Sequence, residues 1–425
     1  MTSKSKWIAR AGFWGTLCLS LLIPHLTFAQ AKQNTCLDCH SALEGNLQVT
    51  AEKWATDIHM VKGFTCADCH GGDPAQMDDK LAMNRAKGFV GAPKGLAIVQ
   101  MCGKCHSDAA FMKKYNPAER VDQVSEYFTS VHGKRLQGGD INVATCVSCH
   151  GVHEIRLVSD PRARVYPLNV ADTCGVCHSN AQLMAPYHIK TNQKEEFQKS
   201  VHYEALVKKG DLSAPTCNKC HGNHGATPPG IGSVANVCGQ CHAVFADLFD
   251  KSPHKAAFAK MDLPSCVHCH GNHEIKKPTD DMLGVADGAL CVQCHVAGEA
   301  GYQQAASMRK GIDQLKVALA GSESLITQAE QKGMEVSQPK YDLIEGRQDL
   351  TKARTQVHSF NAANVESDVK EGLKIAVRTE EKGKQVLSEY QFRRKGLAVS
   401  LIIILAVIVT LYFKIKDIEH RQKAE

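Results

Sequence analysis

The 425-residue chain lacks a dense block of lysine or arginine. Its 50 basic residues are scattered among 44 acidic ones, and the formal charge is only +6. Because a nucleic-acid surface normally appears as a basic cluster, this pattern excludes nucleic acid as an expected partner. Long hydrophobic runs are also scarce, which excludes a membrane protein with many spans, while a hydrophobic content of 43% excludes a wholly disordered chain.

One of the two hydrophobic runs opens the chain. Residues 1–29 begin with three basic residues, continue with an apolar stretch and end in a small-x-small pattern. This order is typical of a secretory signal peptide. An uncleaved anchor is the alternative, and Pro24 and His25 weaken it because they interrupt the apolar stretch.

The second hydrophobic run lies near the other end, at residues 397–413. These 17 residues carry no charge, and as a helix they would be about 26 Å long, enough for one bilayer crossing. We therefore expect a transmembrane helix at 396–414 and a cytoplasmic tail at 415–425. The basic residues on its two sides set the topology only weakly, so the signal peptide decides it and places the preceding chain on the periplasmic or extracytoplasmic side of the cell (inner) membrane.

Cysteine is the unusual component of the composition, with 19 residues. Cys18 lies in the signal segment, and the other 18 all fall in Cys-x-x-Cys-His motifs. These motifs, numbered 1 to 9 in chain order, are Cys36/Cys39/His40, Cys66/Cys69/His70, Cys102/Cys105/His106, Cys146/Cys149/His150, Cys174/Cys177/His178, Cys217/Cys220/His221, Cys238/Cys241/His242, Cys266/Cys269/His270 and Cys291/Cys294/His295.

This pentapeptide is the attachment signature of c-type haem. Its two thiols add to the two vinyl groups of one porphyrin, and the adjacent imidazole binds the iron as proximal ligand. Zinc clusters do not demand a histidine after the second cysteine, and no thiol remains for a disulfide in the mature chain. The sequence thus predicts nine covalently bound c-type haems, with about 29 residues for each, so that the porphyrins themselves would form the core.

Histidine supplies the candidates for the sixth iron ligands. Of 21 histidines, nine are proximal, and His25, His268 and His420 are given no role. The remaining nine are His59, His132, His153, His188, His202, His224, His254, His273 and His358. This equality predicts bis-histidine ligation at most or all irons, and Met83, Met112 or Met184 could replace a histidine at one of them.

The candidate histidines recur at fixed offsets from the motifs. An aromatic residue stands five positions before a histidine in WATDIH (54–59), YFTSVH (127–132), FQKSVH (197–202) and FDKSPH (249–254). A second histidine follows motifs 4, 6 and 8 in CHGxH, whereas motif 2 has Asp73 at that place. We infer duplicated two-haem units made of motifs 2/3, 4/5, 6/7 and 8/9, with motif 1 outside the series. The histidines expected to face another haem's proximal imidazole are His132, His153, His202, His224, His254 and His273.

Residues 301–395 contain no cysteine and form a predicted helical stalk after a haem domain at 30–300. Apolar residues at helical spacing predict helices at 302–332, 340–358 and 364–392, the last capped by Asn364 and running on into the anchor. The plain interpretation is a spacer. The sharper one adds that His358 returns to ligate a haem, which would place one haem near the quinol side of the bilayer.

Residues 36–295, with their paired motifs and CHGxH extensions, resemble the multihaem cytochromes c. The layout is similar to the group of pentahaem nitrite reductase, hydroxylamine oxidoreductase and octahaem tetrathionate reductase, and to its membrane-anchored electron-transfer relatives. The resemblance implies a mainly α fold with long loops, packed around nine haems and followed by the stalk and one transmembrane helix. Catalytic members keep one open haem, several with Cys-x-x-Cys-Lys, and this pentapeptide does not occur here.

The sequence therefore predicts a membrane-anchored electron relay in a respiratory chain of the anaerobic type, with no catalytic residue. The expected partners are the membrane and redox proteins, with a quinol-oxidising cytochrome b-type complex as donor and a periplasmic or outer acceptor. A reductase or oxidase of small nitrogen or sulfur compounds with one open haem is the alternative, and a structural or haem-storage role is a third.

Overall fold

A computed structural model of the chain describes residues 34–228 and 231–424. The predicted signal peptide lies outside the described residues. The chain divides into two compact units, Met1–Ala92 and Pro93–Glu425, here called unit 1 and unit 2. This boundary falls inside the predicted haem domain, between motifs 2 and 3, and each unit is described by itself.

Unit 1 consists of short helices joined by long loops. Its elements are α1 Thr35–His40, η1 Gly45–Leu47, α2 Ala51–Ala55, α3 Ile58–Val61, α4 Cys66–His70, α5 Asp79–Ala82 and η2 Arg85–Lys87. Among its described residues, Trp54 is the one buried apolar side chain. One tryptophan is too small a core to order so long a segment, which fits a unit whose interior is supplied by a bound group.

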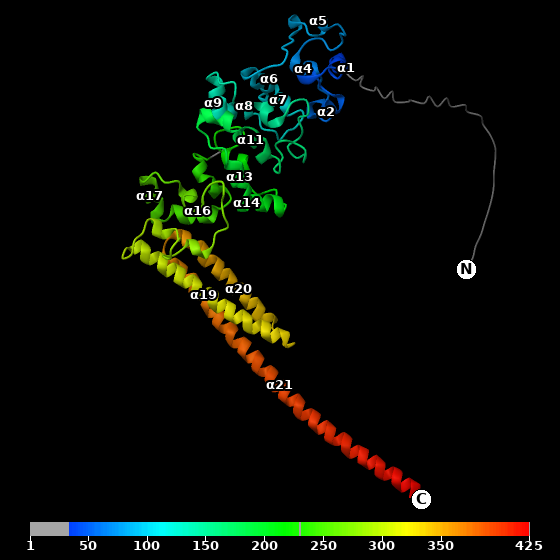
Figure 1. The fold of residues 1–425 in the computed structure, drawn as a ribbon, viewed down its shortest axis with the longest axis vertical. Helices are drawn as coiled ribbons and strands as arrows, with labels where there is room; N and C mark the ends of the chain where they lie inside the picture. The colour runs from blue at the N-terminus through cyan, green and yellow to red at the C-terminus, as the bar shows by residue number, and fades with distance from the viewer. Residues whose placement is uncertain (1–33, 229–230, 425) are drawn as a thin grey trace, which may run out of the picture. The chain divides into compact units, whose positions relative to one another are not determined.

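The first part of unit 2 continues this pattern, and every regular element among the described residues is helical (Figure 1). The elements are α6 Leu96–His106, α7 Ala109–Met112, α8 Gln123–Thr129, α9 Val131–Gln137, α10 Cys146–His150, α11 Val170–His178, α12 Ala181–Met184, η3 Ala185–Tyr187, α13 Gln193–Gln198, α14 Val201–Tyr203, the π-helical η4 Glu204–Lys208, α15 Cys217–His221, η5 Val234–Gln240, α16 Ala243–Asp250, α17 Pro253–Lys260, α18 Ser265–His270, η6 Asp280–Met282 and η7 Cys291–Gln293.

The stalk has the conventional core that the preceding segment has little of. It is formed by α19 Ala300–Gln331, α20 Ser337–Gln356 and α21 Ala362–Ala424, with the short turn η8 Val357–Ser359 between the last two. Ile312, Leu315 and Ile326 of α19 are at most 1% exposed and share a cluster with side chains of the other two helices. Short connections between long helices give the antiparallel arrangement seen in Figure 1.

The stalk helices match the predicted ones in number and order, with shifted N-termini. Helix α20 begins at Ser337, so that Pro339 lies in its first turn, where a missing N–H removes no intrahelical bond. Helix α21 begins at Ala362, and the side chain of Asn361 accepts a hydrogen bond from Ala363 N at 3.0 Å. The cap is therefore Asn361 rather than the predicted Asn364.

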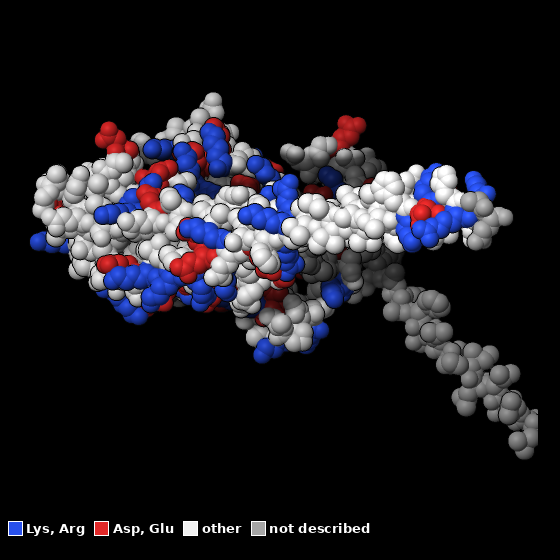
Figure 2. All heavy atoms as spheres, turned by 90° about the horizontal axis from the view of Figure 1, so that it is seen from below, with Lys and Arg blue, Asp and Glu red and all other residues white. Residues whose placement is uncertain are grey.

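Helix α21 continues without interruption for 63 residues and includes the predicted span. Its apolar part is long enough to cross a membrane, and none of it is buried in the protein. Figure 2 shows an uncharged stretch of this helix between two groups of charged side chains. The predicted C-terminal anchor is thus an extension of a stalk helix rather than a separate element.

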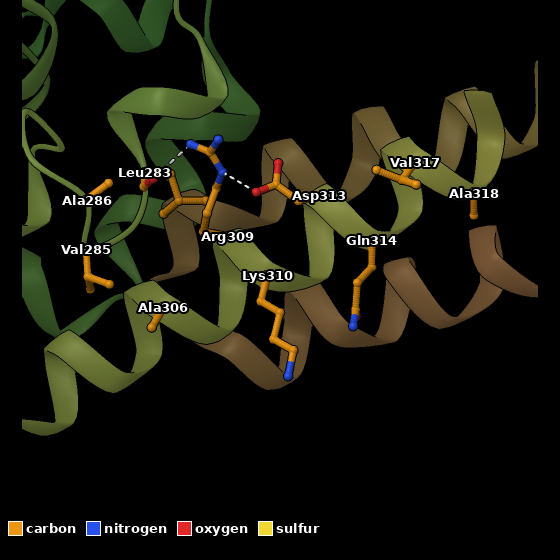
Figure 3. A pocket seen from close by; sticks show the side chains of 10 residues that line it. All are labelled: Leu283, Val285, Ala286, Ala306, Arg309, Lys310, Asp313, Gln314, Val317 and Ala318. Carbon is orange, nitrogen blue, oxygen red and sulfur yellow. Dashed lines mark hydrogen bonds and ion pairs between the residues drawn. The ribbon is translucent and has the colours of Figure 1, made fainter. Parts of the chain in front are cut away.

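Ion pairs fasten the segment between motifs 8 and 9 to the stalk. The Asp280 carboxylate accepts two hydrogen bonds from Arg354, at 2.8 and 2.7 Å, and one from Lys316 at 3.0 Å. Arg309 of α19 reaches the carbonyls of Asp280 and Leu283 and pairs with Asp313 at 2.7 Å (Figure 3). Both α19 and α20 are therefore tied to the loop that leads into motif 9.

Candidate haem sites

Three of the nine motifs form a short helix that begins and ends with their own residues, and a fourth comes within one residue of this. Helices α4, α10 and α15 run from the first cysteine to the histidine of motifs 2, 4 and 6, and α18 begins one residue before motif 8. Positions i, i+3 and i+4 share one helix face, so both thiols and the imidazole point to the same side. Motif 1 forms the end of α1, motifs 3 and 5 end the longer helices α6 and α11, and motifs 7 and 9 lie at 3₁₀ turns, η5 and η7.

A glycine follows the histidine in motifs 2, 4, 6 and 8, and it takes a positive φ each time. At Gly71 an added Cβ would lie 2.1 Å from the carbonyl oxygen of Gly88. Only glycine combines this left-handed turn with such a close approach. The CHG sequence thus turns the chain sharply after the proximal imidazole, toward the second histidine of CHGxH.

Six pairs of histidines face each other inside unit 2. The distance between ring centroids is 6.1 Å for His132 with His178, 6.2 Å for His150 with His224, 6.3 Å for His202 with His242, 6.0 Å for His221 with His273, 6.0 Å for His254 with His295 and 6.0 Å for His270 with His358. Each pair joins one proximal histidine to one of the distal candidates.

The separation of the paired rings fits a metal ion between them. With Fe–N bonds of about 2 Å and ring centres about 1 Å behind the nitrogens, two imidazoles on opposite sides of one iron have their centres about 6 Å apart. The pairs are too far apart to be hydrogen-bonded to one another. The 18 cysteines of the motifs form no disulfides with one another. Motifs 4 to 9 thus hold the donor set that c-type haem requires.

Burial lowers the pKa of nine of the twelve paired histidines. Desolvation is the largest cause that lowers the pKa of His132, His150, His178, His202, His221, His224, His254, His270 and His358. For His150 the pKa falls to about 4, with His224 as the second cause. A neutral imidazole has a free lone pair for iron, so these environments favour ligation over protonation.

The pairs follow one rule along the repeats. The repeated histidine just before motif 4, 6 or 8 faces the proximal histidine of motif 5, 7 or 9, respectively, as His132 faces His178. A histidine of CHGxH faces the proximal histidine two motifs earlier, as His224 faces His150. His358 takes the same place for motif 8, because it faces His270. Neighbouring two-haem units are therefore linked by each other's histidines.

Cysteines of successive motifs also lie side by side. The first cysteines are hydrogen-bonded between motifs 3 and 4, 5 and 6, and 7 and 8, through the pairs Cys102 with Cys146, Cys174 with Cys217, and Cys238 with Cys266. The second cysteines are electrostatic neighbours between motifs 4 and 5, 6 and 7, and 8 and 9, through Cys149 with Cys177, Cys220 with Cys241, and Cys269 with Cys294. Motifs 3 to 9 thus form one contiguous series in chain order, and motifs 1 and 2 are neighbours through Cys36 and Cys66.

The attachment cysteines differ in how far the protein chain covers them, and all 18 are at least partly accessible. Among the second cysteines, those of motifs 1, 2, 7 and 9 are exposed and those of motifs 3, 4, 5, 6 and 8 are half-buried; these residues are Cys39, Cys69, Cys241 and Cys294, and Cys105, Cys149, Cys177, Cys220 and Cys269.

The covalent attachment of haem at these cysteines stays a prediction. Partial exposure agrees with it, because reaction with a vinyl group needs an accessible thiol. The motif sequence supplies both thiols at the required spacing.

The sixth ligands of motifs 1 to 3 stay predictions. His40 Nδ1 lies 2.7 Å from Leu47 O and His70 Nδ1 lies 2.8 Å from Gly91 O, contacts that fix each ring and leave Nε2 for iron. Within the described part of unit 2, the His188 ring faces no proximal histidine, and His188 and His153 both have left-handed backbones. A methionine ligand stays an open alternative for these three motifs.

Two residues that contact distal histidines were not predicted from the sequence. Asp57 is 1% exposed and lies 2.9 Å from His59 Nδ1, a contact that the alignment of WATDIH with the three later repeats could have signalled. The ring of Phe360 lies 3.8 Å from that of His254, and its φ of 52° is strained for a bulky residue. Phe360 follows His358 closely, so one turn supplies both a facing histidine and the packing of another.

A shallow hollow of about 830 Å³ lies on the outer side of the stalk, between residues 283–286 and α19 (Figure 3). Its lining combines apolar side chains with Arg309, Lys310 and Asp313 and includes neither cysteine nor histidine. It is therefore separate from the haem motifs.

Three family models match parts of the chain. Residues 58–179 match cytochrome c3, residues 22–88 match cytochrome c7 and related cytochrome c, and residues 237–316 match cytochrome c554 and c-prime. No curated protein and no solved structure matches the chain. Each match covers less than half of the chain, and all three describe cytochromes of the c type. Together with the motifs, they support a multihaem c-type cytochrome whose function is electron transfer.

Proposed function

We propose that the protein is a membrane-anchored nonahaem electron relay on the extracytoplasmic side of the cell membrane. The six facing histidine pairs carry this proposal, because they give motifs 4 to 9 two protein ligands each. A c-type haem with two histidine ligands supplies one-electron transfer at low potential and has no vacant position for a substrate. The contiguous series from motif 3 to motif 9 supports transfer in chain order.

The length of α21 narrows the choice of donor. The 35 residues from Ala362 to Gly396 precede the apolar span, and at 1.5 Å per residue they hold the His358 end of the stalk about 50 Å from the bilayer along the helix axis. With α21 upright in the bilayer, a haem ligated by His358 would lie well above the membrane surface. A quinol-oxidising partner would need an extracytoplasmic redox domain that reaches this height.

Motifs 1 to 3 are the candidates for the open haem that the reductase alternative requires. From motif 1 to motif 3 the chain contains one distal candidate, His59, and the ring of His188 faces no proximal histidine within the described part of unit 2. An open iron, if the protein has one, would belong to this part of the chain.

The two functions are separated by the spin states of the purified holoprotein. We expect nine haems per chain by haem and protein assay, and only low-spin bis-histidine signals in near-infrared magnetic circular dichroism. A high-spin ferric component together with turnover of nitrite, hydroxylamine or tetrathionate would overturn the relay in favour of the reductase. Reduction of the protein by quinol in proteoliposomes without any other protein would contradict the proposal that a partner carries electrons along the stalk.

A further inference from the structure

The four helices that carry the repeated distal histidines begin in the same way. The residue two positions before the histidine is the N-cap, and it is Asp57 for α3, Ser130 for α9, Ser200 for α14 and Ser252 for α17. All four caps are buried, with exposures between 1% and 8%. The four positions are thus equivalent in the fold, and the first differs from the other three in carrying an acid.

In the later repeats the cap is a neutral hydroxyl that bonds to the main chain. The hydroxyl of Ser130 donates to Tyr127 O at 2.6 Å and that of Ser252 to Phe249 O at 2.7 Å. The hydroxyl of Ser200 accepts from Tyr203 N at 3.1 Å. These bonds shape the start of each helix and bring no charge to the imidazole.

Asp57 makes a different contact. Its Oδ1 accepts from the main-chain N of His59 at 2.9 Å and lies 2.9 Å from His59 Nδ1. The acceptor role toward the N–H places the proton of the imidazole on Nδ1, which leaves the lone pair of Nε2 for a metal. Because Asp57 is 1% exposed, water screens this ion–dipole contact little.

We propose that Asp57 is a positioning residue that makes the haem ligated by His59 more reducing than a serine cap would. A carboxylate on the outer nitrogen makes an imidazole a more basic ligand, and a more basic ligand stabilises ferric over ferrous iron. The proposal rests on the proposed function, because it takes His59 as an axial ligand. His132, His202 and His254, its counterparts in the later repeats, each face a proximal histidine. The relay is thereby asymmetric, with a carboxylate-supported ligand in its N-terminal part.

The repeat supplies its own substitution for the test. In Asp57→Ser holoprotein, spectropotentiometric titration should show one component shifted to higher potential and the other components unchanged, with wild-type haem content and spin state. Asp57→Asn keeps an acceptor for both nitrogens without the charge, and it should shift the same component in the same direction. It serves as the test if the serine variant fails to mature. Asp78→Asn is the control, because Asp78 also caps a helix of unit 1 and its carboxylate bonds to Lys80 N and Leu81 N at an exposed position.

A second variant tests the assignment of His59 as an axial ligand separately from the role of Asp57. His59→Ala should create one high-spin haem, and persistence of nine low-spin haems would remove His59 as a ligand and overturn both proposals at this position. A titration of Asp57→Ser that superimposes on wild type, when His59→Ala does produce the high-spin haem, would overturn the role of Asp57 alone.

Discussion

At the scale of single residues, each facing pair combines a proximal histidine with a distal one. One ring of each pair belongs to a haem motif, and the other comes from a different part of the chain. Its orientation then depends on neighbours such as Phe245, whose ring meets that of His358 edge-on at 4.8 Å. Loss of a distal ring should therefore change the spin state of one iron without loss of the covalent attachment.

We expect His358→Ala to convert one haem from low-spin to high-spin. The substitution removes the ring that faces His270 and leaves the proximal ligand and the two thiols of motif 8 in place. Electron paramagnetic resonance of the oxidised protein measures the change, and the haem content should stay at the wild-type value. The matched control is His268→Ala, an exposed histidine of the same motif, which should leave the spectrum unchanged. A low-spin spectrum in the His358 variant would remove this residue as a ligand.

At the scale of elements, the stalk has to hold His358 in register with α18. Its helices approach closely at small residues, as at Gly346, where an added Cβ would lie 2.6 Å from Leu319 Cδ2. The Asp280 bonds add a lateral tie from α19 and α20 to the loop before motif 9. Arg354, a partner of Asp280, lies one helical turn before His358, so the tie and the facing histidine share one end of α20.

We expect Asp280→Asn to lower the stability of the protein at neutral pH by about 1 kcal/mol, the scale of a partly exposed ion pair. The hydrogen bonds from Arg354 are the largest cause that lowers the pKa of Asp280, to about 2. A lowered folded-state pKa means that the stabilisation is present above the unfolded value near 4 and is lost as the pH falls toward 2.

Thermal unfolding of both proteins across this pH range provides the measurement. The difference in Tm between wild type and Asp280→Asn should be constant above about pH 5 and should shrink below about pH 4. Asp281→Asn is the control, because Asp281 is exposed and pairs with Arg309 alone at 3.1 Å. A difference that stayed constant down to pH 2 would mean that the carboxylate charge is not its source.

At the scale of the whole molecule, the anchor and the haem motifs occupy separate parts of the chain. The last motif ends at His295, and His358 lies before α21 begins. The α19–α20 turn reaches down α21 as far as Tyr390, over whose ring Lys332 lies at 5.2 Å. Packing between the stalk helices thus ends shortly before the apolar span, and the span contributes nothing to the described haem sites.

Deletion of residues 396–425 should therefore release a soluble protein with its full haem content. Fractionation followed by haem assay checks both parts of this expectation. Deletion of 415–425 alone is the control, since it keeps the apolar span and should leave the protein in the membrane fraction. A truncated protein that lost haem would show that the anchor is needed during maturation.

The sequence by itself determined the features that local pattern controls. The spacing of Cys-x-x-Cys-His fixes which atoms can attach and ligate one haem, whatever surrounds them. The apolar periodicity of residues 301–392 determined three helices, and the uncharged run at 397–413 determined an apolar helix that could span a membrane, because helix formation and burial respond to residues three and four positions apart.

Only the tertiary structure decided which histidine faces which and how far each thiol is enclosed. Sequence position alone does not tell which motif each distal histidine faces, because this depends on how neighbouring two-haem units pack. The same holds for His358 against His270 and for Asp57 against His59, since a cap residue meets an imidazole only when the helix start has its final geometry.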